Sequence, residues 1–216
     1  MTLPAPPNPR LKTQWFRHGD SRGAAQQASA AAFIVWRVAR NVLDRTRHAG
    51  FDVEVGRPYF LFLREVLAFL VAIADRVAHA RLEPAQRVEF TGAMVHHLAR
   101  ILQDSEDDLI GAAPDGQPCN GDAFIDLVNE LSGHYAEFGA DPAAACAPGT
   151  FEPDFSFLRY LGRRLEASVP EHDRRWIQDQ VIAAEAPHAV AMLQQSLRDL
   201  FEPPARRPRR QSVSGD

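Results

Sequence analysis

The pattern of hydrophobic and polar positions is most uniform in the stretch 58–81, which we expect to form a central helix. Nine apolar residues run without a break from Val66 to Ala74, and a second apolar block precedes them at 59–63. A helix that faces water on one side shows an apolar stripe, whereas one that is apolar nearly all round is buried on most sides. The run is shorter than the roughly 20 apolar residues that cross a bilayer. The sequence therefore predicts a buried helix at the middle of an all-α protein.

Apolar residues recur at helical spacing in five further stretches, which turn-forming residues separate. We predict helices at 24–47, 83–104, 122–138, 154–168 and 171–201. Pro187 lies inside the last of these and removes a backbone hydrogen bond, so we expect a kink there. We interpret the acidic run 104–108 as a solvated turn or one that contacts a cation, because like charges so close together repel. These elements predict a single-domain bundle of about six helices.

The two ends of the chain lack a core-forming pattern. Four prolines fall among the first nine residues, so we expect residues 1–23 to be a disordered extension, with Trp15 and Phe16 docking on the body as an anchor. Residues 202–216 are predicted to be a disordered basic tail, which leaves 24–201 as the helical domain. The tail either solubilises the protein or tethers it to an acidic partner, nucleic acid or anionic lipid through its arginines, Arg206, Arg207, Arg209 and Arg210.

Composition narrows the class of protein without naming a function. A chain of 216 residues with 45% hydrophobic content can build a core without disulfides or metals, and its net charge of −4 argues against a general nucleic-acid binder. Its two cysteines, Cys119 and Cys146, lie in separate loops rich in Gly and Pro, and whether they pair or react is open. Such sparse cysteine usage, together with the absence of a secretory signal pattern, favours a cytoplasmic, bacterial-type protein.

Carboxylates and histidines at helical spacing suggest a metal site inside the bundle. Glu185 and His188 have the Glu-x-x-His spacing of ferritin-like di-metal proteins, and Glu130 and His134 also lie one turn apart. Glu65, with Glu89 or His97, would complete a set drawn from four helices. Carboxylate and imidazole ligands of this mix suit iron, manganese or zinc, so one hypothesis is a helical oxidoreductase with a di-iron site or a mononuclear iron or manganese site, the latter using His134 and His188.

Several features count against the metal hypothesis. A ferritin-like site needs two Glu-x-x-His copies, and the sequence holds one, with Pro187 between its ligands. Buried carboxylates are uncommon unless paired, so we expect Glu65 and Asp75 to lie at the rim of the bundle. There they would pair with Arg64 and Arg76 or with partners on other helices, the alternative being a polar site that they line. The chain also lacks nucleophile-elbow, phosphate-loop and dinucleotide motifs, so the catalytic residues stay unknown and enzymatic activity uncertain.

The favoured hypothesis is a binding protein without a cofactor: an adaptor or chaperone-like assembly factor that uses a groove between helices. Long loops rich in Ala, Pro and Gly separate the later helices, and aromatic residues cluster at the start of the predicted helix 154–168. Exposed aromatic side chains often mark protein interfaces. We therefore predict that Phe155, Phe157 and Tyr160 contact a protein partner.

Overall fold

The computed structural model describes residues 24–112, 120–139 and 150–202, and within these ranges it contains helices and connections but no β-strand. Counting α6, η3 and α7 as one continuous rod gives the predicted six helices in an all-α bundle. The helices are α1 (Ala24–His48), α2 (Arg57–His79), α3 (Pro84–Ile110), α4 (Asn120–Glu137), α5 (Phe155–Leu165), α6 (Glu171–Gln180) and α7 (Ala186–Phe201). A 3₁₀ turn, η2 (Glu166–Ser168), follows α5, and a π-helical turn, η3 (Val181–Glu185), joins α6 to α7.

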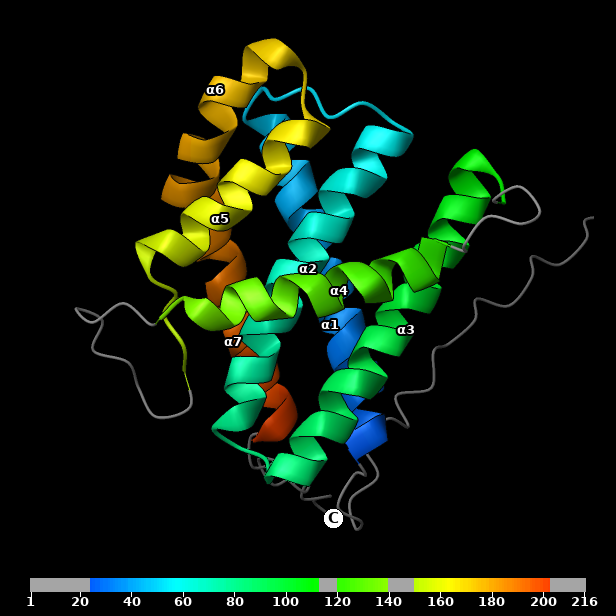
Figure 1. Ribbon diagram of the computed structural model, residues 1–216, viewed down its shortest axis with the longest axis vertical. Helices are drawn as coiled ribbons and strands as arrows, with labels where there is room; N and C mark the ends of the chain where they lie inside the picture. The colour runs from blue at the N-terminus through cyan, green and yellow to red at the C-terminus, as the bar shows by residue number, and fades with distance from the viewer. Residues whose placement is uncertain (1–23, 113–119, 140–149, 203–216) are drawn as a thin grey trace, which may run out of the picture.

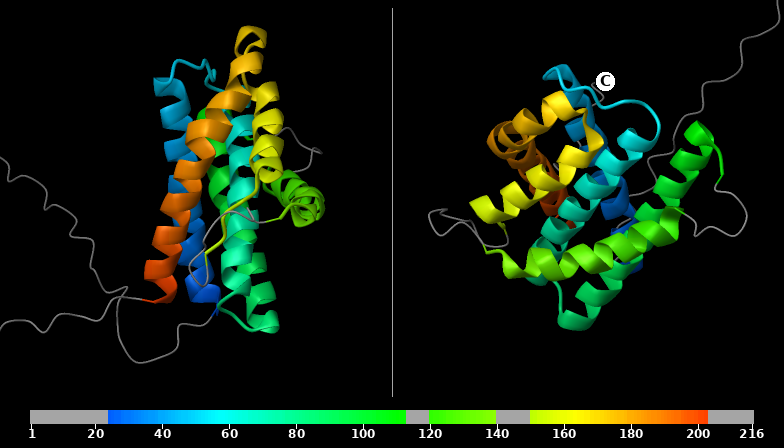
Figure 2. Two further views of the ribbon diagram at one scale, coloured as in Figure 1. Left: turned by 90° about the vertical axis from the view of Figure 1, so that its left-hand side faces the viewer. Right: turned by 45° about the horizontal axis from the view of Figure 1, so that its top comes forward.

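Helix α2 is the buried centre of the bundle, as the sequence predicts. Fourteen of its 23 residues are buried, and it borders α1, α3, α4, α5 and α7 (Figure 1). Its proline, Pro58, lies in the first turn, where a missing N–H leaves no helical bond unmade. Figure 2 shows α1, α2, α3 and α7 running roughly along one direction while α4 crosses them. Within the described ranges, no helix has both the length and the apolar character needed to cross a bilayer.

The connection from α1 to α2 depends on two glycines with positive φ angles. Gly50 follows α1 with a φ of 97°, and Gly56 precedes α2 with a φ of 113°. Side chains with a Cβ rarely adopt this region, so glycine is the residue that lets the chain turn twice within a short segment. The turn brings the start of α2 beside α1, where both helices contribute to the pocket described below.

The helix predicted at 171–201 is present as α6, the π-helical turn η3 and α7, and the turn accommodates Pro187. The N–H of Ala186 donates to the carbonyl of Val181, five residues earlier, which is the π-helical spacing. Pro187 consequently falls in the first turn of α7, where its missing N–H is tolerated. The wider turn gives the proline ring room that a regular α-helix would not provide.

The predicted turn at 104–108 is wrong, because α3 continues through the acidic run to Ile110. Arg64 on α2 donates to both carboxylate oxygens of Glu106, at 2.7 and 2.8 Å, and so offsets one of the repelling charges. The hydroxyl of Ser105 donates to the carbonyl of Ile101, and the Gln103 amide donates to Asp107. These contacts hold the acidic segment in helical form.

Candidate binding pocket

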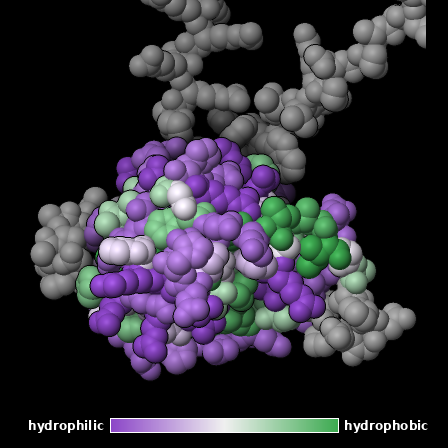
Figure 3. Space-filling model, turned by 90° about the horizontal axis from the view of Figure 1, so that it is seen from above, coloured by the Kyte–Doolittle hydropathy of each residue, from purple (hydrophilic) through white to green (hydrophobic). Residues whose placement is uncertain are grey.

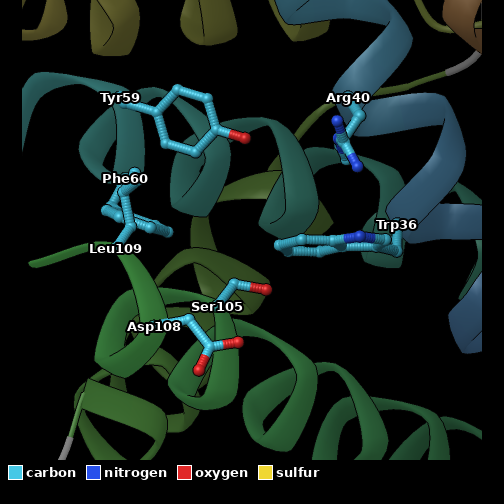
Figure 4. A pocket seen from close by; sticks show the side chains of 7 residues that line it. All are labelled: Trp36, Arg40, Tyr59, Phe60, Ser105, Asp108 and Leu109. Atoms are coloured by element: carbon cyan, nitrogen blue, oxygen red, sulfur yellow. The ribbon is translucent and has the colours of Figure 1, made fainter. Parts of the chain in front are cut away.

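An open pocket of about 300 Å³ lies where α1, α2 and α3 meet (Figure 4). Figure 4 shows the Trp36 indole and the Tyr59 ring on opposite walls, with Asp108 and Ser105 on the α3 side. Ligand pockets range from roughly 300 to 1,000 Å³, so this one fits a single bulky side chain or a small molecule. Its lining residues are Trp36, Arg40, Tyr59, Phe60, Ser105, Asp108 and Leu109.

Helical spacing explains why these side chains converge. Trp36 and Arg40 are one turn apart on α1, and Ser105 and Asp108 are one turn apart on α3, so each pair shares a helix face. Tyr59 is supported from behind by Arg47, whose guanidinium carbon lies 5.4 Å from the ring centroid. Arg47 in turn donates to the carbonyl of Val53, at 3.1 Å from its Nε, which fixes its position. Contacts within the protein therefore hold the Tyr59 ring in position without a ligand.

The end of α3 beside the pocket carries several negatively charged side chains. Asp104, Asp107 and Asp108 lie in its last turns, and no basic residue is found in the last turn. The carbonyl end of a helix is itself partially negative, so carboxylates there are unfavourable and cations are favoured. Within the described ranges, neither Asp104 nor Asp108 has an ion-pair partner. This end of the helix thus attracts a positively charged ligand.

Glu106 belongs to the same acidic run but faces the interior. Burial raises the pKa of the Glu106 carboxyl above its usual value, although the hydrogen bonds and charge of Arg64 oppose the rise and Asp107 adds to it. Because Arg64 compensates Glu106, the charge offered to a ligand comes from the three aspartates and not from Glu106.

Apolar surface continues outward from the pocket. Leu109 lines the pocket and is 49% exposed, Ile110 follows it at 46%, and Leu61 on α2 is 36% exposed. Figure 3, which looks down on this end of the molecule, shows hydrophobic side chains gathered towards its edge. A partner that enters the pocket would therefore find further apolar surface to cover.

Two of the predicted metal ligands are buried and bound by arginines. Glu65 accepts hydrogen bonds at 2.9 and 2.6 Å from Arg164 on α5. Glu185, at the end of η3, accepts from Arg45 at 2.7 Å and from the Gln180 amide at 2.9 Å. The expected pairing of Glu65 with a partner on another helix is confirmed, but its expected position at the rim is wrong, because Glu65 is buried in the core-facing part of α2.

The second carboxylate flanking the apolar run of α2 is also paired. Asp75 accepts from Arg87 and from the hydroxyl of Thr91, both on α3. The expectation that Asp75 would find its arginine nearby or on another helix is therefore confirmed.

The other predicted metal ligands lie at the surface. Glu130, His134 and His188 are exposed, and the His134 ring lies 5.7 Å from the ring of Tyr160. Among the alternatives for completing the set, Glu89 is exposed and His97 half-buried. The structure thus brings Glu130 and His134 near the region of Tyr160, while Glu185 pairs with α1. Across the described residues, no three His, Cys, Asp or Glu side chains are grouped to hold a metal ion, and the iron or manganese site stays a prediction.

The three aromatic residues predicted to contact a partner have different environments. Phe155 is 61% exposed, Tyr160 is half-buried and Phe157 is fully buried. The Phe157 ring packs edge-on against Phe69 of α2 at 5.6 Å, so it belongs to the core. Phe155 and Tyr160 remain available to a partner, and Phe157 does not.

Several sequence predictions fall outside the described residues. These are the anchoring role of Trp15 and Phe16, the state of Cys119 and Cys146, and the disorder and the tethering role of the tail with Arg206, Arg207, Arg209 and Arg210. They stay predictions.

The chain has no match among protein families, characterised proteins or solved structures. The pocket and its charges are therefore the basis on which we assign a function.

Sequence reasoning missed the pocket although two signals for it were present. Trp36 shares the apolar stripe of α1, which made it indistinguishable from a core residue, and it is half-buried. The acidic run was visible, but its interpretation as a turn hid the fact that it ends a helix beside aromatic residues. Acidic residues without basic neighbours at the end of a predicted helix would have pointed to this site.

Proposed function

We propose that the protein is a helical binding module that takes up a bulky aromatic side chain flanked by basic residues on a partner protein. The observation that carries the proposal is the juxtaposition in one pocket of aromatic walls, Trp36 and Tyr59, with an acidic helix end that includes Asp108. Adaptor or chaperone-like activity in the cytoplasm is compatible with this chemistry and is part of the proposal.

The aromatic walls of the pocket favour an aromatic side chain of the ligand, and the acidic end of α3 favours its basic side chains. Burying an apolar side chain is worth about 1.5–3 kcal/mol, and an aromatic ring gains further from edge-to-face contact with Trp36 and Tyr59. A nearby lysine or arginine would relieve the repulsion among the aspartates at the end of α3. We take a Kd of about 0.1–1 mM, equivalent to about −5.5 to −4.1 kcal/mol, as the working value for a short peptide that makes these contacts.

Arg40 favours one orientation of the ligand in the pocket. It lies on the α1 side of the pocket, whereas Asp108 lies on the α3 side (Figure 4). A basic ligand residue is therefore favoured near α3 and disfavoured near α1, where Arg40 would instead donate to carbonyl groups of the ligand backbone. Ser105 is occupied with the Ile101 carbonyl, which supports a wall role for this residue.

A set of capped peptides tests the proposal by titration calorimetry with the full chain. The peptide Lys-Lys-Trp-Lys-Lys should bind, while the versions with Ala in place of Trp, or with Glu in place of Lys, should bind at least tenfold more weakly. Trp36→Ala in the protein should reduce the affinity at least tenfold, and Asp104→Asn combined with Asp108→Asn should reduce it and weaken its salt dependence.

Matched variants elsewhere serve as controls. Trp176→Ala changes an exposed tryptophan on α6, and Asp126→Asn changes an exposed carboxylate on α4, so neither should alter the affinity. Equal binding of the Trp and Ala peptides, or an affinity unaffected by Trp36→Ala, would contradict the proposal.

A further inference from the structure

We propose that the chain's own residues 10–17 occupy this pocket, with the Trp15 side chain between Trp36 and Tyr59, and so compete with the partner. The inference rests on the proposed function, because it assigns an occupant to the same pocket. Residues 1–23 lie outside the described ranges, and what bears on the inference is their composition and their length.

The composition of this segment complements the pocket. Residues 10–17, RLKTQWFR, place two adjacent aromatic residues among three basic ones and contain no acidic residue. The pocket offers two aromatic walls beside the acidic end of α3, which has no basic residue in its last turn. The basic side chains of the segment would supply the positive charge that this helix end lacks.

The segment is long enough to reach the pocket. Trp36 lies twelve residues into α1, which begins at Ala24, so the two are about 18 Å apart along the helix. Trp15 precedes Ala24 by nine residues, and nine extended residues span up to about 30 Å. The connecting residues 16–23 can therefore turn back along α1 and still place the indole in the pocket.

Attachment to the same chain makes even a weak contact effective. A connection of this length gives an effective concentration in the millimolar range, about 5 mM. With a Kd of about 0.5 mM for the isolated segment, the pocket would be mostly self-occupied, and the apparent affinity for an external peptide would fall about tenfold. A partner would thus need more contacts than the segment has, such as the apolar surface at Leu109 and Ile110.

The three tryptophans of the chain report on this contact separately. Trp15 is in the segment, Trp36 lines the pocket, and Trp176 lies on α6 away from it. The full chain labelled with 5-fluorotryptophan should give three fluorine NMR resonances, which single Trp→Phe variants assign. In the double variant Trp15→Ala/Phe16→Ala, the Trp36 resonance should shift and the Trp176 resonance should stay in place. Leu3→Ala, in the same extension, should leave both unchanged.

Affinity for the Lys-Lys-Trp-Lys-Lys peptide gives the second readout. The double variant should bind it about five- to tenfold more tightly than the wild-type chain, because the internal competitor is gone. Trp15→Phe keeps an aromatic anchor and should retain wild-type affinity.

The outcomes separate the two proposals. If all chains bind the peptide equally and the Trp36 resonance does not move, self-occupation is overturned while the proposed function stands. If no chain binds the peptide and the Trp36 resonance does not move, both are overturned. A Trp36 shift that depends on protein concentration would assign the pocket to the segment of a second copy and overturn occupation within one chain.

Discussion

The hydroxyl of Tyr135 lies in the core, and it has no hydrogen-bond partner within the described residues. Its ring packs against Phe157 at 4.7 Å and edge-on against Phe69 at 6.1 Å. Burial raises the pKa of Tyr135 well above its usual value, and the nearby charge of Glu65 adds to the rise while Arg164 opposes it. The residue therefore stays protonated at neutral pH and contributes packing through its ring while its hydroxyl remains unsatisfied.

Replacing Tyr135 with Phe should therefore leave the free energy of unfolding unchanged or raise it by up to about 1 kcal/mol. The ring contacts are retained, and the desolvation cost of an unpaired hydroxyl is removed. Urea denaturation measures the change, with Tyr160→Phe at a half-buried position as the control. A loss of more than about 1 kcal/mol would show that the hydroxyl has a strong partner.

A second pair of variants separates the core aromatic residue from its exposed neighbour. Phe157→Ala should destabilise the protein by about 3–5 kcal/mol because it opens a cavity among packed rings. Phe155→Ala, two residues earlier and 61% exposed, should change stability by less than about 0.5 kcal/mol. Similar effects of the two substitutions on the thermal midpoint would be evidence against the placement of Phe157.

At the scale of elements, ion pairs between a buried glutamate and an arginine of another helix fix how the helices dock. Glu65 on α2 pairs with Arg164 on α5, and Glu185 at the end of η3 pairs with Arg45 on α1. The partners are 99 and 140 residues apart in sequence. The sequence predicts that a carboxylate inside an apolar run needs a cation, but its periodicity does not say which arginine supplies it. Such pairs contribute little net stability, because the cost of removing charge from water offsets the attraction.

Arg164→Ala should therefore destabilise the protein by about 3 kcal/mol, because it leaves the Glu65 carboxylate buried and unpaired. The double variant Glu65→Leu/Arg164→Met should recover most of this loss. Arg163→Ala, on the exposed side of α5, should have an effect below about 0.5 kcal/mol in the same denaturation experiment. If Arg164→Ala lowered the free energy of unfolding as little as Arg163→Ala does, the buried pairing of Glu65 with Arg164 would be contradicted.

The pair between Arg64 and Glu106 gives a pH-dependent prediction. Because the pKa of Glu106 is raised in the folded protein, its contribution to stability is fully present below its ordinary pKa of 4.5 and is lost as pH rises through the folded value. The stability difference between wild type and Glu106→Gln should consequently fall, in favour of the variant, as pH increases above about 4.5. Urea denaturation of both proteins at a series of pH values measures this difference. A difference that rises with pH would mean that the folded pKa is lowered instead.

At the scale of the whole molecule, hydrophobic periodicity was sufficient to predict the all-α class and the central position of α2, because both depend on where apolar residues fall along one helix. The continuation of α3 and the π-helical turn could not be predicted this way. The continuation of α3 depends on the contact of Glu106 with Arg64, which is 42 residues away in sequence. The π-helical turn depends on how the backbone relieves the steric clash at Pro187. The pocket was missed for the same reason, because its walls come from three separate helices. Its negative charge comes from the end of α3, which charge repulsion taken alone predicts to be non-helical.

The central claim, that this pocket is the binding surface, is tested most directly by amide chemical-shift mapping as Lys-Lys-Trp-Lys-Lys is titrated into the full chain. The largest shifts should occur at 36–40 on α1, 59–61 on α2 and 104–110 on α3. The exposed face of α5 and α6 around Phe155 and Trp176 should not respond. Shifts concentrated on that face, or none at the end of α3, would contradict the claim.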